Sequence, residues 1–69
     1  MSTEITFQVE ESAEGGFEAS GLGVPIFTEA DTVEELRTMV RDAVECHFDP
    51  EERPKVIRLH FVRDEIIAE

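Results

Sequence analysis

The sequence predicts an α+β domain in the order β-β-β-α-β, with one helix on one face of a four-stranded mixed sheet. Three observations predict this fold. Apolar and polar residues alternate over residues 4–10 and again over 55–62, as in strands with one buried face. Between these segments, apolar residues recur at helical spacing behind a capping sequence. A pair of glycines follows the first alternating segment and permits a tight hairpin.

The first two strands form an antiparallel hairpin in this interpretation. Ile5, Phe7 and Val9 occupy alternate positions of residues 4–10 and face the core. Gly15 and Gly16 allow positive φ at the turn. Residues 16–20 alternate again, so the second strand turns its own apolar positions inward.

Residues 26–28 form a short third strand after a turn over residues 21–25. Ile26 and Phe27 are adjacent, and adjacent strand residues point to opposite faces. One of these two side chains therefore leaves the helix-covered face, and the sequence does not decide which.

The helix has the clearest signals. Thr32 and Glu35 form a Thr-x-x-Glu capping box. The helix is expected to end near Phe48, because Asp49 precedes Pro50 and residues before proline disfavour the α region. The stripe of the helix that faces the sheet consists of Val33, Leu36, Val40, Ala43, Val44 and His47. Within this stripe, His47 is expected to be half-buried.

The last strand follows a polar connection that contains two prolines. Its residues Ile57, Leu59 and Phe61 alternate toward the core face. A right-handed crossover through the helix would place this strand parallel to the first and beside it. With strands numbered along the chain, the predicted sheet order is 3-2-1-4, and residues 1–69 form a single domain.

Charge and size restrict the partners. Seventeen acidic residues face six basic ones, for a formal net charge of -11. Phosphate backbones and anionic membranes would repel such a chain, whereas a basic protein would be attracted. The alternative is that the acidic surface only maintains solubility. A core this small usually needs further support, and the single Cys46 excludes an internal disulfide, so we expect a homodimer or larger assembly.

No catalytic, cofactor or metal site emerges from the residue pattern. His47 and His60 are the two histidines, and Cys46 adjoins His47 on a helix, where neighbouring side chains diverge. No Cys-x-x-Cys or His-x-x-x-His spacing is present, and no serine has a catalytic partner at a known spacing. We therefore expect a non-enzyme. Without a signal sequence or a long apolar run, we also expect a cytoplasmic protein.

One sheet face has no element of this chain to cover it, which predicts an interface there. Arg58 and His60 project from that face of the last strand and could orient a partner or a second subunit. The residues predicted for this partner or self-interface are Phe27, Val56, Arg58, His60 and Val62.

Three stretches resemble the N-terminal domain of the HicB-like antitoxin family, and together they cover nearly the whole chain. They are the alternating strand of residues 5–9, the Gly-Gly-aromatic-x-Ala sequence of residues 15–19, and the Asp-Thr-x-Glu-Glu opening of residues 31–35. Two departures are the turn at residues 22–25 and Leu36, where the family has Leu-Pro-Gly and alanine.

The resemblance implies a partial ribonuclease-H-like fold without the catalytic carboxylates of that enzyme. It also implies binding of a small basic mRNA-cleaving toxin of the HicA type. The DNA-binding module that such antitoxins usually carry after this domain has no counterpart in these 69 residues, so no direct nucleic-acid binding is expected. The alternative is a self-associating scaffold or subunit domain that has no toxin partner.

Overall fold

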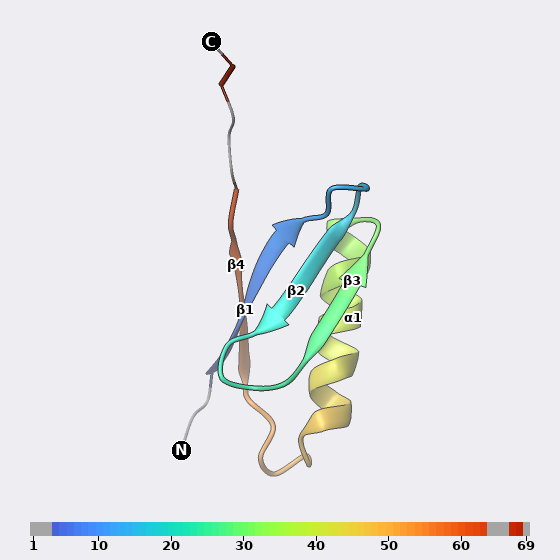
Figure 1. The fold of residues 1–69 in the computed structure, drawn as a ribbon. Helices are drawn as coiled ribbons and strands as arrows, with labels where there is room; N and C mark the ends of the chain where they lie inside the picture. The colour runs from blue at the N-terminus through green and yellow to red at the C-terminus, as the bar shows by residue number, and fades with distance from the viewer. Residues whose placement is uncertain (1–3, 64–66, 69) are drawn as a thin grey trace.

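In the part of the chain that the structure describes, a mixed four-stranded sheet and one helix make up the fold (Figure 1). The structure is a computed structural model that describes residues 4–63 and 67–68. β1 pairs antiparallel with β2 and parallel with β4, and the strand order is β3-β2-β1-β4. This confirms the predicted α+β class and sheet order. The elements are β1 Glu4–Glu11, β2 Phe17–Gly21, β3 Phe27–Ala30, α1 Val33–His47 and β4 Val56–Phe61.

The β1–β2 hairpin depends on its two glycines. Gly15 and Gly16 have φ of 99° and 85°. The Ser12 N–H donates to the Gly16 carbonyl at 3.0 Å, and the Gly15 N–H donates to the Ser12 carbonyl at 3.1 Å. This turn fixes the register that sets Val9 opposite Ala19, so both side chains enter the core.

β3 begins one residue later than predicted and continues to Ala30. Ile26 lies before the strand, where its carbonyl accepts a hydrogen bond from the Gly21 N–H at 2.8 Å. Ile26 is 8% exposed and Phe27 is 60% exposed. Of the two residues between which the sequence could not decide, Phe27 is therefore the one that leaves the core.

The capping box of α1 is formed with one difference, because the Glu35 carboxylate binds the Asp31 N–H and not the Thr32 N–H. Thr32 Oγ1 accepts from the Glu35 N–H at 3.1 Å, and the Glu35 carboxylate accepts from the Asp31 N–H at 3.3 Å. Leu36, Val40 and Val44 are buried against the sheet. The prediction that His47 is half-buried was wrong, because its side chain is exposed at the last residue of α1, beyond Val44, the last buried side chain of the helix.

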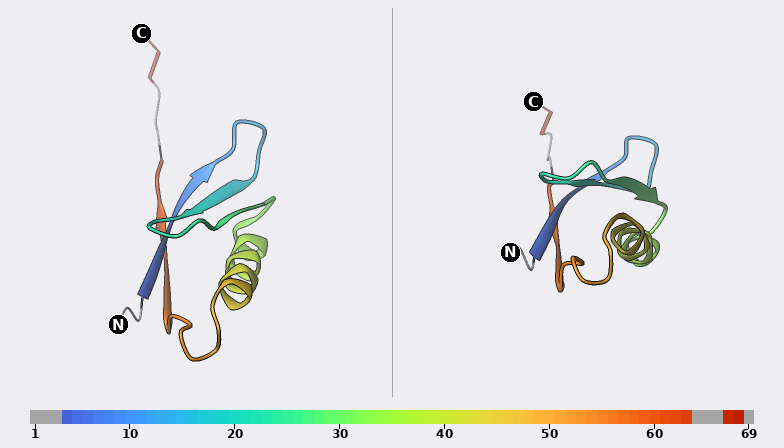
Figure 2. Two further views of the ribbon diagram at one scale, coloured as in Figure 1. Left: turned by 60° about the horizontal axis from the view of Figure 1, so that its bottom comes forward. Right: turned by 90° about the horizontal axis from the view of Figure 1, so that it is seen from below.

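α1 packs mainly on β3 and β2, so it covers only part of the sheet (Figure 2). Phe7 and Ala19 of the sheet are completely buried beneath it, and Leu36 is completely buried on the helix face that packs on the sheet. On β4, Ile57 and Leu59 face the same side but are only partly buried, and Phe61 is 50% exposed. The uncovered part of this face leaves a groove at one end of the sheet and an exposed flank along β4.

Candidate functional site: an apolar groove and an acidic sheet face

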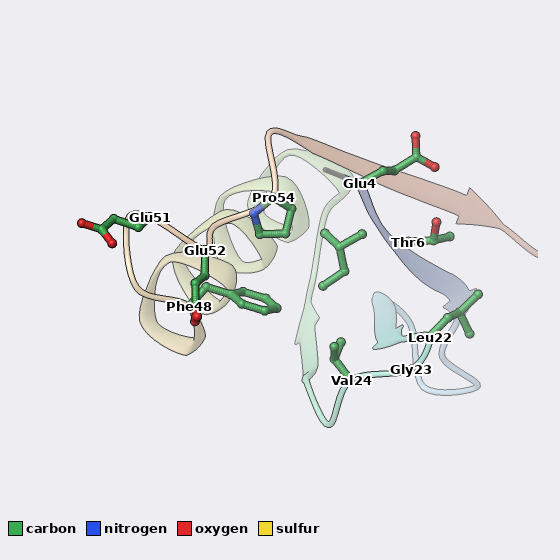
Figure 3. Close-up of a pocket in the computed structure, with 10 residues that line it drawn as sticks. Glu4, Thr6, Leu22, Gly23, Val24, Phe48, Glu51, Glu52 and Pro54 are labelled. Carbon is green, nitrogen blue, oxygen red and sulfur yellow. The ribbon is translucent and has the colours of Figure 1, made fainter. Parts of the chain in front are cut away.

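A groove of about 820 Å³ lies at the end of the sheet where β1 begins. Two loops that are distant in sequence form its walls: the β2–β3 loop and the connection from α1 to β4 (Figure 3). Phe48 and Pro54 lie across the opening from Val24. The groove is lined by Glu4, Ile5, Thr6, Leu22, Gly23, Val24, Phe48, Glu51, Glu52 and Pro54.

Backbone hydrogen bonds hold the β2–β3 wall in place. The Leu22 N–H donates to the Thr6 carbonyl at 2.9 Å, which fastens the loop to β1. The Ile26 N–H donates to the Val24 carbonyl at 2.9 Å, and Gly23 has a φ of 84°. A side chain at position 23 would be strained in this left-handed conformation. These contacts direct Val24 against the core, while Leu22 remains 54% exposed.

The opposite wall begins where α1 ends. Phe48 is extended, and its N–H donates to the Val44 carbonyl at 3.1 Å. A turn follows, closed by a hydrogen bond from the Glu52 N–H to the Asp49 carbonyl at 2.9 Å. Arg53 Nη2 donates to the Glu45 carbonyl at 3.2 Å and so ties the connection to the last turn of the helix. The wall is therefore anchored at both of its ends.

The groove combines an apolar interior with carboxylates at its rim. Ile5, Val24 and Phe48 belong to the apolar core or pack against it. Glu51 points outward into solvent (Figure 3). An apolar segment that carries positive charge at its ends would match both features, because its apolar part would leave water while its charges met carboxylates.

Glu4 at the rim forms an ion pair with Arg58 of β4. The two contacts are Arg58 Nε to Glu4 Oε2 at 3.0 Å and Arg58 Nη2 to Glu4 Oε1 at 3.1 Å. The bidentate hydrogen bonds and the opposite charge lower the pKa of Glu4 and raise that of Arg58. Both side chains are exposed, so the pair fixes their orientation more than it stabilises the fold.

A row of three carboxylates crosses the sheet face that α1 does not cover. The strand register places Glu10 opposite Glu18, and Glu18 opposite Glu29. Like charges directly opposite each other on neighbouring strands repel. A hollow of about 670 Å³ adjoins Glu10 and Glu18 and is also lined by Val62 and Arg63. This acidic row concentrates part of the net charge of -11 on one rigid surface.

Replacing Glu18 by lysine is expected to stabilise the protein by about 1 kcal/mol. The change converts two repulsive cross-strand pairs into attractive ones, each worth roughly 0.2–1 kcal/mol. Thermal unfolding at low salt would measure the gain. The matched control is Glu14→Lys, which makes the same charge change in the exposed β1–β2 loop. Equal gains in both variants would show that net charge alone, and not the acidic row, matters.

Four of the five residues predicted for an interface lie together at β4. Val56 is 49% exposed, and Arg58 and His60 are exposed. Val62 follows the strand and donates its N–H to the Val9 carbonyl at 2.8 Å. Phe27 lies apart from them on β3. In the row of residues that pair across the strands, Ser20 of β2 and Gln8 of β1 lie between Phe27 and His60 of β4.

The other residues singled out for chemistry are not brought together. His60 lies on β4, whereas His47 and Cys46 are exposed at the end of α1. The His47 ring packs edge-on against Phe48, with centroids 4.9 Å apart. Across residues 4–63 and 67–68, no group of three or more His, Cys, Asp or Glu side chains could hold a metal ion. None of the helices in the same residues is long and apolar enough to span a bilayer.

Sequence reasoning did not find the groove. Its signal in the sequence is that four apolar residues occupy positions where loops are expected to be polar. Buried loop segments are unusual, so apolar side chains in two separate loops suggest that the loops pack on one another or on a shared surface. The four residues are Leu22, Val24, Phe48 and Pro54.

Comparison with known proteins finds relatives of similar length. A UPF0150 protein of Thermotoga maritima is 48% identical over 65 residues, which is 94% of this chain and 91% of the relative. A UPF0150 protein of Archaeoglobus fulgidus is 54% identical over 52 residues, covering 75% of this chain and 77% of the relative. No protein-family model matches the chain, and no solved structure matches it.

Proposed function

Because the chain belongs to the UPF0150 protein family, whose name states no activity, we propose its function from its surfaces: it is a cytoplasmic domain that binds a small basic protein. The observation that carries the proposal is the groove, in which an apolar interior adjoins carboxylates at one end of an acidic domain. Binding there would bury the half-exposed Leu22 and would neutralise charges at the rim.

Electrostatics support a basic partner in two ways. The net charge of -11 creates a field that accelerates encounter with a positively charged protein. The acidic row and the groove rim then offer fixed carboxylates, which favour one orientation of the bound partner over others. The complex is therefore expected to weaken as salt is added, because exposed charge pairs are screened.

The resemblance to HicB-like antitoxins suggests the kind of basic partner, namely a small mRNA-cleaving toxin that the domain would neutralise. The sheet order and the single helix are compatible with this proposal. Co-expression of the chain with any small basic protein that is encoded beside its gene tests it. Rescue of growth and recovery of a complex would support the toxin hypothesis, and a harmless neighbour that forms no complex would end it.

Reversing charge at the groove rim is expected to weaken the complex more than the same change elsewhere. In the double variant Glu51→Lys and Glu52→Lys, affinity should fall by at least tenfold at low salt, measured by titration calorimetry. The control is Glu11→Lys with Glu14→Lys, near the hairpin loop at the opposite end of β1 (Figure 1). Equal losses in both double variants would contradict binding at the groove.

A further inference from the structure

The outer edge of β4 has backbone groups that no strand within residues 4–63 pairs. β4 ends the sheet, with β1 on its inner side (Figure 1). The Val62 N–H points inward to the Val9 carbonyl, and successive residues of a strand direct their backbone groups to opposite sides. Ile57, Leu59 and Phe61 therefore direct their N–H and C=O groups outward, away from β1.

Both faces beside this edge are incompletely covered. On the helix side, α1 packs mainly on β3 and β2, so Phe61 remains 50% exposed. On the other side, Val56 is 49% exposed. An edge strand with free backbone groups and flanking apolar side chains is a template for pairing with another strand.

The sequence of β4 is self-complementary when it pairs antiparallel about Leu59. Leu59 then faces Leu59 of the second copy, and Ile57 faces Phe61, all on the helix side. On the outer side, Val56 faces Val62 and Arg58 faces His60. The pairs that exchange hydrogen bonds are those of Ile57, Leu59 and Phe61, which are the residues whose backbone groups point outward.

Neighbouring registers lose this match. A two-fold axis at Arg58 would set two arginines against each other and Phe61 against Lys55. An axis at His60 would set two histidines together and Ile57 against Arg63. Only the axis at Leu59 places apolar residues opposite apolar residues on both faces, and a two-fold interface requires such self-complementarity.

The distribution of charge also favours β4 over β3 as the edge at which two copies pair. Residues 55–63 contain no carboxylate in a chain with seventeen of them, whereas β3 at the other edge carries Glu29 beside Glu18. In the Leu59 register, Arg58 is already paired with Glu4 of its own copy, so its contact with His60 adds little repulsion. The like-charged pairs that remain, Lys55 with Arg63, lie at the exposed ends.

From these observations we infer that two copies of this chain associate through antiparallel pairing of their β4 strands about Leu59, which joins their sheets into one of eight strands. Stable interfaces generally bury at least about 1,000 Å², and a six-residue edge with its apolar flanks lies at the small end of that range. The dimer is therefore expected to dissociate on dilution. It does not depend on the proposed basic partner.

Cysteine cross-linking tests both the edge and the register. In a Cys46→Ser background, one chain carries Val56→Cys and another carries Val62→Cys. In the proposed dimer these positions face each other at a Cα separation of about 4.5 Å, within the range for a disulfide. Mixing and oxidising the two variants should give at least tenfold more covalent dimer than either variant alone, because two copies of position 56 lie about 20 Å apart.

Equal yields in the mixture and in the single variants would overturn the register, and a concentration-independent monomer of the unmodified chain in sedimentation equilibrium would overturn the dimer. Circular dichroism checks that each variant is folded.

The dependence on salt concentration distinguishes this self-association from the proposed binding of a basic protein. Between about 50 and 500 mM NaCl, self-association of two acidic copies should strengthen several-fold, whereas a complex with a basic protein should weaken.

Discussion

Replacing Leu36 by alanine is expected to unfold a large part of the protein at 25 °C. Leu36 is completely buried where α1 meets the sheet, and a leucine-to-alanine change in such a position costs about 2–5 kcal/mol. A domain this small has a total stability of roughly 3–5 kcal/mol. The loss is therefore comparable to the whole free energy of unfolding. Urea denaturation followed by circular dichroism would measure it.

Met39→Ala is the matched control for Leu36→Ala, because Met39 lies on the same helix but is 45% exposed. Alanine has at least the helix propensity of either residue, so propensity cannot cause a loss in either variant. We expect a cost below about 1 kcal/mol for Met39→Ala. A Leu36→Ala variant that is destabilised no more than Met39→Ala would show that α1 does not pack on the sheet as described.

Gly16→Ala is expected to lower the free energy of unfolding by about 2 kcal/mol or more. Gly16 has a φ of +85°, which strains any residue with a side chain. A Cβ there would also lie 2.7 Å from the Ala30 carbonyl oxygen. Since that atom belongs to the backbone of the last residue of β3, either the hairpin or the end of β3 would have to move.

Gly15→Ala separates these two causes. Gly15 has a φ of +99°, but a Cβ at this position meets nothing within 4 Å. Its substitution carries the backbone strain alone, roughly 1–2 kcal/mol. The difference in unfolding free energy between the two variants then reports the close approach of the hairpin to the β3–α1 junction. If Gly15→Ala and Gly16→Ala lower the free energy of unfolding equally, the close approach of Gly16 to Ala30 does not add to the cost of Gly16→Ala.

Local sequence signals were enough to predict most of the fold. The glycine pair, the alternation in β1 and the Thr32–Glu35 capping box each act through neighbouring residues, and each is formed in the structure. The sheet order followed from chain geometry, because a helix of this length carries the chain back to a strand parallel to β1. The register of β3 needed its pairing with β2, so its bounds were predicted less well.

The groove could not be predicted in the same way, because it depends on where the helix lies across the sheet. Periodicity shows which side of α1 is apolar, but not which strands it covers. α1 packs mainly on β3 and β2, and that position leaves room between the two loops that carry Val24 and Phe48. The exposure of His47 has the same origin, since burial of a helix end depends on how far the sheet extends beneath it.

The placement of α1 also divides the molecule into parts of unequal cooperativity. β4 is bonded along one side to β1 and receives little cover from the helix, so detaching it would expose less apolar surface than opening the β1–β2–β3 unit around Phe7. Its amide hydrogens should therefore exchange with solvent by local opening, at a free energy below that of global unfolding. A binding surface on β4 would thus belong to the least protected strand of the sheet.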